Sequence, residues 1–475
     1  MNDREKPFEL NFFRSRQIGA DEHILTVESG EWCIVSSGEL SQIKKDFSAV
    51  DEELHKKLLA CHVILSAENR REYVRQLGIR RKEVLTPPSL HIVVVTPQCN
   101  LRCIYCHAAM QQHEKGHMTR ETASRVLEKI LSTPGDAGVL EIQGGEPLLN
   151  FDVVKFLVTE GRARAEKEQK YLDFSIVTNF TDLLTEEKIR FLVQNNVQVS
   201  TSIDGPEEVH EDNRNRVFPN GFAVLKDRIS LFRQIWKECR DDAPQLSAML
   251  TATKKVLDKP EETVDTFLEL GFTDFFARPV NPLGRGERNI PELEYSAEDF
   301  VSFWSRLIDY IIDCRKRGVM AGETHLDLLL RKIFFRDNGY MDLRFPCGAS
   351  YGQRTYNFDG KIYTCDEGRM VREQQFCIGS LDSADHELNR SPNGRNTFLA
   401  SISELYYCEF CAYKPFCGVC PILNFKQTGN MVTSIYNSRR CKIYRGMLDY
   451  VFHKFLTDRD ARNIFSDMVL EGLEE

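Results

Sequence analysis

Short apolar runs alternate with amphipathic segments through the middle of the chain. The first run, LHIVVVT (Leu90–Thr96), is continuous and rich in β-branched residues, which is typical of a strand buried on both faces. Five later runs share this character: Val139–Gln143, Leu172–Thr178, Val197–Ile203, Leu246–Thr253 and Asp274–Val280. The segments between them have helical periodicity: Thr119–Ser132, Phe151–Lys167, Thr185–Gln194, Gly221–Cys239 and Pro260–Leu270. This alternation predicts parallel βα units, arranged as an open doubly wound sheet or as a partial barrel.

The pattern changes on either side of this region. Residues 1–88 are charged, and the runs Ile24–Val27 and Glu31–Val35 predict a hairpin that is followed by helices. Residues 340–445 are turn-rich and contain eight cysteines. We therefore expect five parts: an N-terminal α+β domain (1–88), an α/β core (89–290), a helical linker (291–339), a cysteine-rich domain (340–450) and a C-terminal helical tail (451–475).

Composition narrows the functional classes. The formal net charge of −9 disfavours binding to nucleic acid through bulk charge. No apolar run approaches the roughly 18 residues of a membrane span, and the start MNDREKPFEL lacks the apolar core of a secretion signal. We therefore expect a cytoplasmic protein with neither nucleic acid nor membrane as a partner. In such a protein the clustering of its 15 cysteines favours metal ligation over disulfides.

The first cysteine cluster directly follows the first predicted strand. Cys99, Cys103 and Cys106 are spaced Cys-x3-Cys-x2-Cys in PQCNLRCIYC. Chemistry in parallel βα folds gathers at the carboxyl ends of the strands, where this loop is expected. Three thiolates can hold three irons of a 4Fe–4S cube and leave the fourth iron open to a small molecule. The alternative is a zinc site completed by His107 or His113.

Further motifs lie at the ends of the next strands. QGGEP (Gln143–Pro147) ends the second, TNFT (Thr178–Thr181) the third and SIDGP (Ser202–Pro206) the fourth, and HEDNR (His210–Arg214) follows. Glycines allow close approach of the backbone to a ligand, although GGEP is also compatible with a plain turn. In this order, over roughly residues 90–280, the motifs resemble those of the radical S-adenosylmethionine (SAM) superfamily. Phe180 stands where that family commonly has glycine.

The resemblance implies an α/β fold with a partial (β/α)6 TIM-like barrel and a 4Fe–4S cluster on the three cysteines of the first loop. It also implies a set of residues that contact SAM: Tyr105, Gln143, Gly144, Gly145, Glu146, Ser202 and Arg214. Arginine suits the SAM carboxylate because its guanidinium fork matches two oxygens. The alternative for Arg214 is a surface ion pair with Glu211. Asp204 is interpreted as structural, and the catalytic base is unknown.

The C-terminal cysteines form a second pattern. It reads Cys347-x12-Gly360-x4-Cys365, then Cys408-x2-Cys411-x5-Cys417-x2-Cys420, then Cys441. This resembles the SPASM extension, which holds two auxiliary 4Fe–4S clusters, although that family usually has x3 before its sixth cysteine. The resemblance implies two ligand sets: Cys347, Cys365 and Cys420 for auxiliary cluster I, and Cys408, Cys411, Cys417 and Cys441 for auxiliary cluster II.

Auxiliary cluster I is one ligand short in this assignment. Either Cys377 supplies the fourth ligand, or one iron stays open to substrate. The alternative for the whole region is a pair of structural zinc sites. Four cysteines match no motif and are interpreted as small buried hydrophobic residues: Cys33, Cys61, Cys239 and Cys314.

The resemblance also implies a reaction class. The first cluster, with SAM, would produce a 5′-deoxyadenosyl radical that takes hydrogen from an unactivated carbon, and auxiliary clusters would accept the electron left over when a new bond closes. This favours an oxidoreductase that cross-links side chains of a short, ribosomally made precursor peptide. An external electron donor such as flavodoxin or ferredoxin is expected. The chain looks most like the His-Xaa-Ser system maturases, which act with a partner maturase.

Other functions stay open. One is formylglycine formation on a sulfatase, which a base near the fifth and sixth strand ends would favour, but Leu246–Val280 offers no evident candidate. Another is a catalytically inert iron–sulfur electron-transfer or zinc-binding scaffold. The hairpin and helices of residues 1–88 resemble winged-helix modules that bind a leader peptide at a strand edge, or they form a domain that only packs on the barrel. The sequence identifies neither the peptide, nor the bond formed, nor the oligomeric state.

Overall fold

A computed structural model describes most of the chain. The described residues are 8–81, 87–108, 116–214, 218–336, 340–341, 344–402, 406–434 and 436–474. His113, one of the two histidines considered as a zinc ligand, lies outside them.

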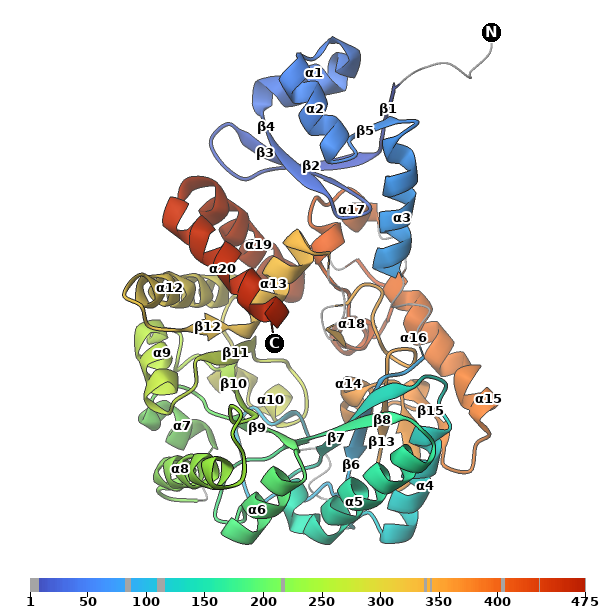
Figure 1. Cartoon of the computed structure of the whole chain (residues 1–475), viewed down its shortest axis with the longest axis vertical. Coiled ribbons are helices and arrows are strands. Elements are labelled where there is room, and N and C mark those ends of the chain that lie inside the picture. The colour runs from blue at the N-terminus through green and yellow to red at the C-terminus, as the bar shows by residue number, and fades with distance from the viewer. Residues whose placement is uncertain are drawn as a thin grey trace.

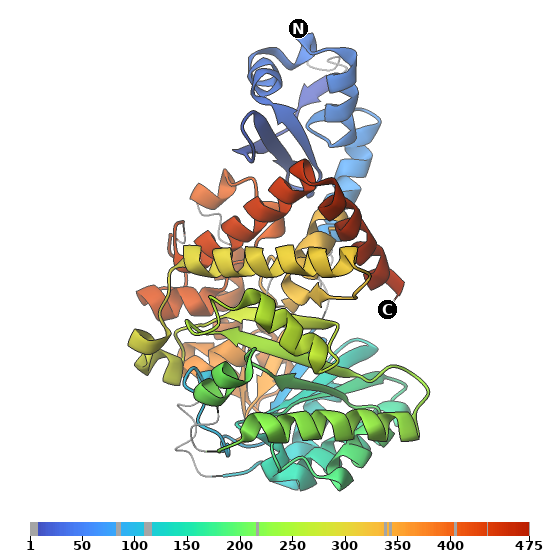
Figure 2. The same cartoon turned by 90° about the vertical axis from the view of Figure 1, so that its left-hand side faces the viewer.

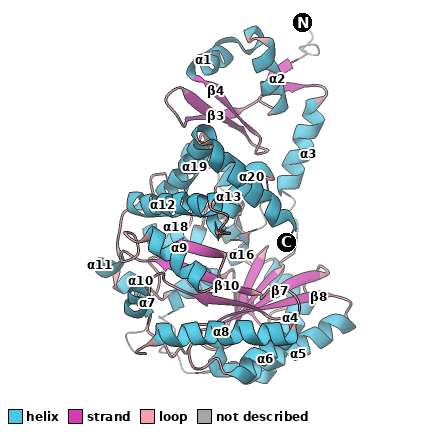
Figure 3. Cartoon of the chain, turned by 60° about the vertical axis from the view of Figure 1, so that its left-hand side comes forward, coloured by secondary structure: helices cyan, strands magenta, loops and turns pink. Residues whose placement is uncertain are grey.

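A sheet of ten strands forms the centre of the molecule (Figure 1). It contains the six predicted strands, parallel and in chain order: β6 (Leu90–Val94), β7 (Ala137–Gln143), β8 (Tyr171–Val177), β9 (Gln198–Ser202), β10 (Leu246–Ala252) and β11 (Asp274–Pro279). The helices that connect them lie outside the curved sheet (Figure 3): α4 (Arg120–Leu131), α5 (Phe151–Lys167), α6 (Glu186–Gln194), α7 (Glu207–Arg214), α8 (Gly221–Cys239) and α9 (Pro260–Glu269). The predicted α/β fold is confirmed, and because the strand order never reverses it is a partial barrel rather than a doubly wound sheet.

Local sequence explains these elements. Val93 and Val94 of β6 are fully buried, as expected for a β-branched strand covered on both faces. The side chain of Thr119 accepts a hydrogen bond from the backbone of Thr122 and so caps α4, and Thr185 caps α6 in the same way. None of the described helices is long and apolar enough to cross a membrane.

The C-terminal third of the chain continues the same sheet. β12 (Gly322–Glu323) pairs with β11, and β13 (Gln353–Tyr356) runs parallel to β6 and continues antiparallel into β14 (Lys361–Tyr363) and β15 (Cys377–Ser380). The helices of this part are α10 (Arg285–Arg288), α11 (Ile290–Leu293), α12 (Ala297–Lys316), α13 (Thr324–Phe334), α14 (Asp366–Val371), α15 (Asp385–Asn389), α16 (Pro392–Ile402), α17 (Tyr406–Glu409), α18 (Pro421–Thr428), α19 (Arg439–Thr457) and α20 (Arg459–Glu474). The cysteine-rich segment is therefore built onto the barrel edge through β13.

The N-terminal residues form a separate small domain. Its main sheet has the order β2 (Phe13–Gln17), β3 (Glu22–Val27), β4 (Trp32–Ser36), so the hairpin suggested by the sequence is present as β3 and β4. The other elements are β1 (Phe8–Leu10), paired with β5 (Ile64–Ser66), and α1 (Ser37–Asp46), α2 (Glu52–Ala60) and α3 (Asn69–Arg81). This domain has its own core, which includes Leu25, Leu54 and Leu58. Figure 2 shows it (blue) seated on the C-terminal helices (red).

Candidate functional site

The loop that follows β6 holds three thiols close together. Cys103 is buried, whereas Cys99 and Cys106 are partly exposed, and the backbone of Cys106 donates to the carbonyl of Cys103 at 3.2 Å. Burial raises the pKa of Cys99 well above its usual value, and the charges of the Cys103 and Cys106 thiolates raise it further. Burial also raises the pKa of Cys103 to about 11. Thiolates in this position need a bound cation, which is the condition a cluster of iron ions satisfies.

The glycine pair of QGGEP packs against that loop. The backbone of Gly145 donates to the carbonyl of Thr96 at 2.8 Å, and a Cβ on Gly144 would lie only 2.6 Å from the same oxygen. The backbone of Glu146 donates to the carbonyl of Gln98 at 2.8 Å. The segment therefore does more than turn the chain, because it holds the end of β7 against the residues that precede Cys99.

Glu146 ties two strand ends together. Its carboxylate accepts hydrogen bonds from the backbone of Leu148, the hydroxyl of Thr178 and the backbone of Asn179, at 2.8 to 3.0 Å. Burial raises its pKa, and these donors oppose that rise. Most of its capacity to accept hydrogen bonds is used within the protein, so its predicted contact with the SAM ammonium stays a prediction. Gln143, at the end of β7, donates to Glu141 and lines the central cavity described below.

A buried charge network lies beside the thiols. Nη1 of Arg214 donates to the Tyr105 hydroxyl at 2.6 Å, and that hydroxyl donates to Asp204 at 2.8 Å. Burial raises the pKa of Asp204 to about 6, while the charge of Arg214 and the Tyr105 hydroxyl act in the opposite direction. The positive charge of Arg214 also offsets part of the rise that burial causes in the pKa of Cys103.

Arg214 is available for an anion at this place. It is only 6% exposed, and its Nε has no hydrogen-bond partner among the described residues. The surface ion pair considered for it is wrong, because Glu211 instead accepts from the backbone of Phe222 at 2.6 Å. An unpaired buried guanidinium nitrogen near a thiol cluster fits the carboxylate of SAM. Ser202 lies at the carboxyl end of β9 and is half-buried, and its contact with SAM stays a prediction.

Two asparagines at the site were not found by motif reasoning. The Asn179 amide donates to the Asn100 side chain at 2.8 Å and approaches Cys99 Sγ at 3.9 Å. Phe180 next to it has a positive φ of 54°, the backbone conformation for which glycine is favoured. Its ring is fully buried against Phe232, which explains how a bulky residue is retained at this position.

A cavity of about 850 Å³ fills the barrel next to these residues. Small-molecule sites typically have about 300–1,000 Å³. Its walls include Val177, Ser200 and Arg278 from the strands. His107 also lines it, and burial lowers the pKa of this histidine to about 4. Acidic groups reach it from the C-terminal segment, namely Asp366 and Glu367, which the sequence analysis missed because they are close to the barrel only in space.

The three cysteines assigned to auxiliary cluster I line one small cavity of about 60 Å³. Cys365 is fully buried, and burial together with the charges of Glu367, Cys347 and Cys420 raises its pKa far above the usual value. Cys377 is not among the lining residues; its thiol donates to the carbonyl of Gly379 at 3.4 Å.

The four cysteines assigned to auxiliary cluster II also lie together. Burial raises the pKa of Cys408 to about 11, and the charges of Cys411 and Cys441 add to this. Burial raises the pKa of Cys417 to about 12, with contributions from the other three. Among the described residues, no three side chains of His, Cys, Asp or Glu come close enough to hold a single metal ion. A four-iron cube holds its thiolates farther apart than one ion does, because each sulfur binds a different iron.

The remaining cysteines divide into two groups. Cys33, Cys61 and Cys314 are buried, as expected, and the first two thiols lie 3.1 Å apart. Cys239 is exposed, so its interpretation as a buried residue is wrong; it is the last residue of α8, at the surface end of that helix.

Comparison with known proteins identifies relatives of this arrangement. Residues 93–238 match the family model of the radical SAM superfamily. A cysteine-type anaerobic sulfatase-maturating enzyme of Clostridium perfringens (strain 13 / Type A) is 22% identical over 382 residues, which covers 78% of this chain and 98% of that protein. The radical SAM cyclopropyl synthase TigE of Paramaledivibacter caminithermalis is 27% identical over 362 residues, 69% of each protein.

Solved structures share the fold. Native anSMEcpe with bound AdoMet has a TM-score of 0.66 at 20% identity and covers 80% of this chain and 100% of its own. Streptococcus suis SuiB bound to precursor peptide SuiA has a TM-score of 0.54 at 15% identity and covers 90% of this chain and 98% of its own. At these identities the likeness concerns the fold.

Proposed function

We propose that this chain, whose residues 93–238 match the radical SAM family model, is a radical SAM enzyme that oxidatively cross-links side chains of a ribosomally made precursor peptide. A 4Fe–4S cluster and SAM are the cofactors of this domain. When bound, they supply a 5′-deoxyadenosyl radical that takes hydrogen from a carbon of the substrate. The observation that carries the proposal is the meeting of three thiols, a glycine cradle and a buried unpaired arginine nitrogen beside a large cavity.

The chain's own residues have distinct roles in this proposal. Cys99, Cys103 and Cys106 hold three irons, and Arg214 binds the SAM carboxylate. Tyr105 and Asp204 orient Arg214 through the hydrogen-bond chain described above. The backbone of Gly144 and Gly145, the Gln143 and Ser202 side chains and the remaining acceptor capacity of Glu146 complete the pocket. The walls of the barrel exclude water, which protects a radical from side reactions.

Two auxiliary clusters are part of the proposal. The thiols of Cys408, Cys411, Cys417 and Cys441 would bind one, and those of Cys347, Cys365 and Cys420 the other, with one iron open because Cys377 does not line that cavity. Glu367 lines both the small cavity and the barrel cavity, so its carboxylate lies near the thiols that would hold this cluster. A cluster in this place can accept the electron that remains when a substrate radical closes a bond.

A peptide substrate suits the architecture. Solved structures of the same fold are described as bound to a peptide, namely anSMEcpe with Cp18Cys peptide and SuiB with precursor peptide SuiA. In the described part of the N-terminal domain, β2 and β4 are edge strands with one neighbour each. An extended leader peptide can add to such an edge by main-chain hydrogen bonds. We extend the proposal to a precursor with repeated His-Xaa-Ser motifs, a partner maturase, and flavodoxin or ferredoxin as electron donor.

Co-expression with small open reading frames that neighbour the gene tests this function. Peptide mass spectrometry should show a loss of two hydrogens, located by fragmentation on two linked side chains. The matched inactive form is Cys103→Ala, and Cys239→Ala serves as a cysteine control because that thiol is exposed and outside every motif. An unmodified precursor in the presence of the active chain, its partner genes and reductant would contradict the proposal.

A second candidate is formylglycine formation. This reaction needs a base, and the carboxylates of Asp366 and Glu367, which line the cavity, are candidates for it. The curated relatives also include anaerobic sulfatase-maturating enzymes. A hydrazide probe distinguishes the two functions. It reacts with the aldehyde of formylglycine on a Ser- or Cys-containing sulfatase peptide, and it does not react with a cross-linked peptide.

A further inference from the structure

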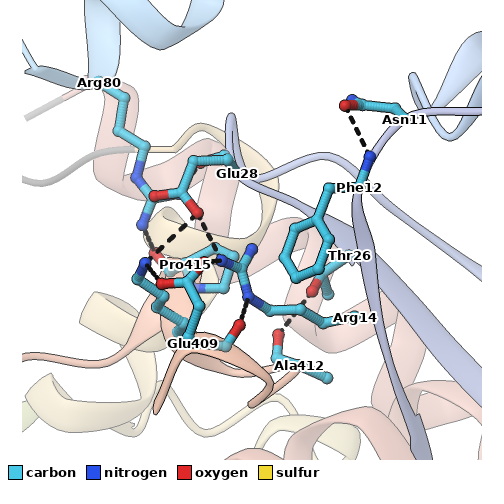
Figure 4. A network of polar contacts seen from close by, with 10 residues as sticks. Asn11, Phe12, Arg14, Thr26, Glu28, Arg80, Glu409, Ala412 and Pro415 are labelled. Carbon is cyan, nitrogen blue, oxygen red and sulfur yellow. Dashed lines mark hydrogen bonds and ion pairs between the residues drawn. The ribbon is translucent and has the colours of Figure 1, made fainter. Parts of the chain in front are cut away.

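Donors from the N-terminal domain bind three backbone carbonyls of the 408–417 loop, which carries three of the four thiols assigned to auxiliary cluster II. Arg14 Nε donates to the Glu409 carbonyl, and the Thr26 hydroxyl donates to the Ala412 carbonyl at 2.8 Å. Arg80 donates to the Pro415 carbonyl (Figure 4). These contacts join parts of the chain that are more than 300 positions apart.

Buried charges reinforce this contact. Arg14 Nη2 lies 2.7 Å from both the Glu28 and the Glu409 carboxylates, and the Arg14 side chain is completely buried. Lys414 contacts the same two carboxylates and is 10% exposed. Two cations and two carboxylates thus compensate each other across the boundary between the N-terminal domain and the 408–417 loop. Removal of Arg14 takes away one of the two cations that Glu28 and Glu409 share and leaves Lys414 to compensate both partly buried carboxylates, which weakens the contact.

A second contact reaches the helix that carries the fourth thiol. Arg16 forms a two-pronged pair with Asp449 of α19, with both distances 2.6 Å. The Tyr413 hydroxyl donates to the same carboxylate at 2.6 Å. Cys441 lies near the start of α19, so β2 is connected to both elements that supply thiols. The Arg16 guanidinium also lies over the Tyr413 ring, with its central carbon 5.3 Å from the ring centre, which places its charge next to a residue two positions after Cys411.

We propose that the N-terminal domain is a structural part of the auxiliary cluster II site: Arg14 and Arg80 hold the 408–417 loop in the shape that binds iron, and the charge of Arg16 sets the reduction potential of the cluster. This rests on the proposed function, in which these four thiols bind a 4Fe–4S cluster. Reduction adds negative charge to a cluster, so loss of the Arg16 cation, which leaves the Asp449 carboxylate without its guanidinium partner, disfavours the reduced state and lowers the potential. Arg14 and Arg80 are positioning residues that act through the 408–417 loop, and Arg16 acts from its pair with Asp449 of α19.

Substitutions at two positions, Arg14 and Arg16, separate the parts of this proposal. The full chain is reconstituted anaerobically, and its iron and sulfide are measured; three cubes correspond to about 12 of each per chain. Arg14→Ala should lose about four of each, together with the electron paramagnetic resonance (EPR) signal of one cluster. Arg14→Lys should retain more iron than Arg14→Ala because it keeps the charge. Arg16→Gln should keep all the iron and lower the midpoint potential of that one cluster in an EPR redox titration.

The matched control is Arg70→Gln. Arg70 forms an exposed ion pair with Glu9 in the same domain, so both iron content and potentials should equal those of the wild type. The inference is overturned if Arg14→Ala keeps about 12 irons and Arg16→Gln leaves every midpoint potential unchanged. A wild-type chain that binds only about four irons would instead contradict the proposed function. The two failures are therefore distinguishable.

Discussion

Replacement of Arg214 by glutamine tests the SAM pocket without changing a cysteine. The guanidinium is buried, one nitrogen donates to Tyr105 at 2.6 Å, and Nε is unpaired. A hydrogen bond between charged groups contributes about 1.5–3 kcal/mol. Since about 1.4 kcal/mol corresponds to a factor of ten in affinity, the Kd for SAM should rise about 10- to 150-fold. Arg214→Lys should recover part of this loss, because it keeps the charge and loses the fork.

The assay is equilibrium binding of SAM to the anaerobically reconstituted protein. Iron content is measured in parallel, because Arg214 also affects the pKa of Cys103 and its loss could disturb the cluster. Arg102→Gln is the matched control, since Arg102 is exposed on the same loop and should leave SAM affinity unchanged. If Arg214→Gln retains its iron and binds SAM as tightly as the wild type, the role assigned to this arginine is refuted.

Three further predictions concern single residues. Gly145→Ala places a Cβ 2.5 Å from the carbonyl carbon of Gln98. This crowding should lower the stability by about 1–3 kcal/mol and weaken SAM binding, and wild-type SAM affinity in a titration would contradict this. Phe180→Gly removes a positive φ that costs about 1 kcal/mol of stability, but it also removes a buried ring that contributes about 3–5 kcal/mol. Denaturant unfolding should therefore show a net loss of stability, and a gain would contradict the packing argument. Burial lowers the pKa of His91 from 6.5 to about 3, so its contribution to stability is present above pH 6.5 and is lost as the pH falls towards 3. At pH 5.5 the loss is about 1.4 kcal/mol, and His91→Gln should reduce the difference between the Tm values at pH 7.5 and 5.5, whereas an unchanged difference would contradict it.

Local patterns made much of the core predictable. A run such as Leu90–Thr96 has few alternatives to a buried strand, and Cys99, Cys103 and Cys106 are neighbours along the chain, so their proximity follows from spacing alone. The capping residue Thr119 acts within four positions and is equally visible in the sequence.

Contacts between distant segments were not predictable. Asp366 and Glu367 reach the barrel cavity only because β13 pairs with β6, and no local sequence pattern predicts this pairing. Arg14 reads as an ordinary charged residue near the N-terminus, yet the fold buries it between Glu28 and Glu409. The motif for Glu146 suggested a ligand contact, whereas its hydrogen bonds within the protein depend on the end of β8 lying next to it.

The central claim is that three thiols near position 100 hold a cluster with one iron open to SAM. Its most direct test is the yield of 5′-deoxyadenosine from SAM after reduction, in the wild type and in the Cys99→Ala, Cys103→Ala, Cys106→Ala triple variant. The account predicts that the wild type forms 5′-deoxyadenosine, and that the triple variant forms none while it keeps about eight auxiliary irons. Formation of 5′-deoxyadenosine by the triple variant at the wild-type rate would contradict it.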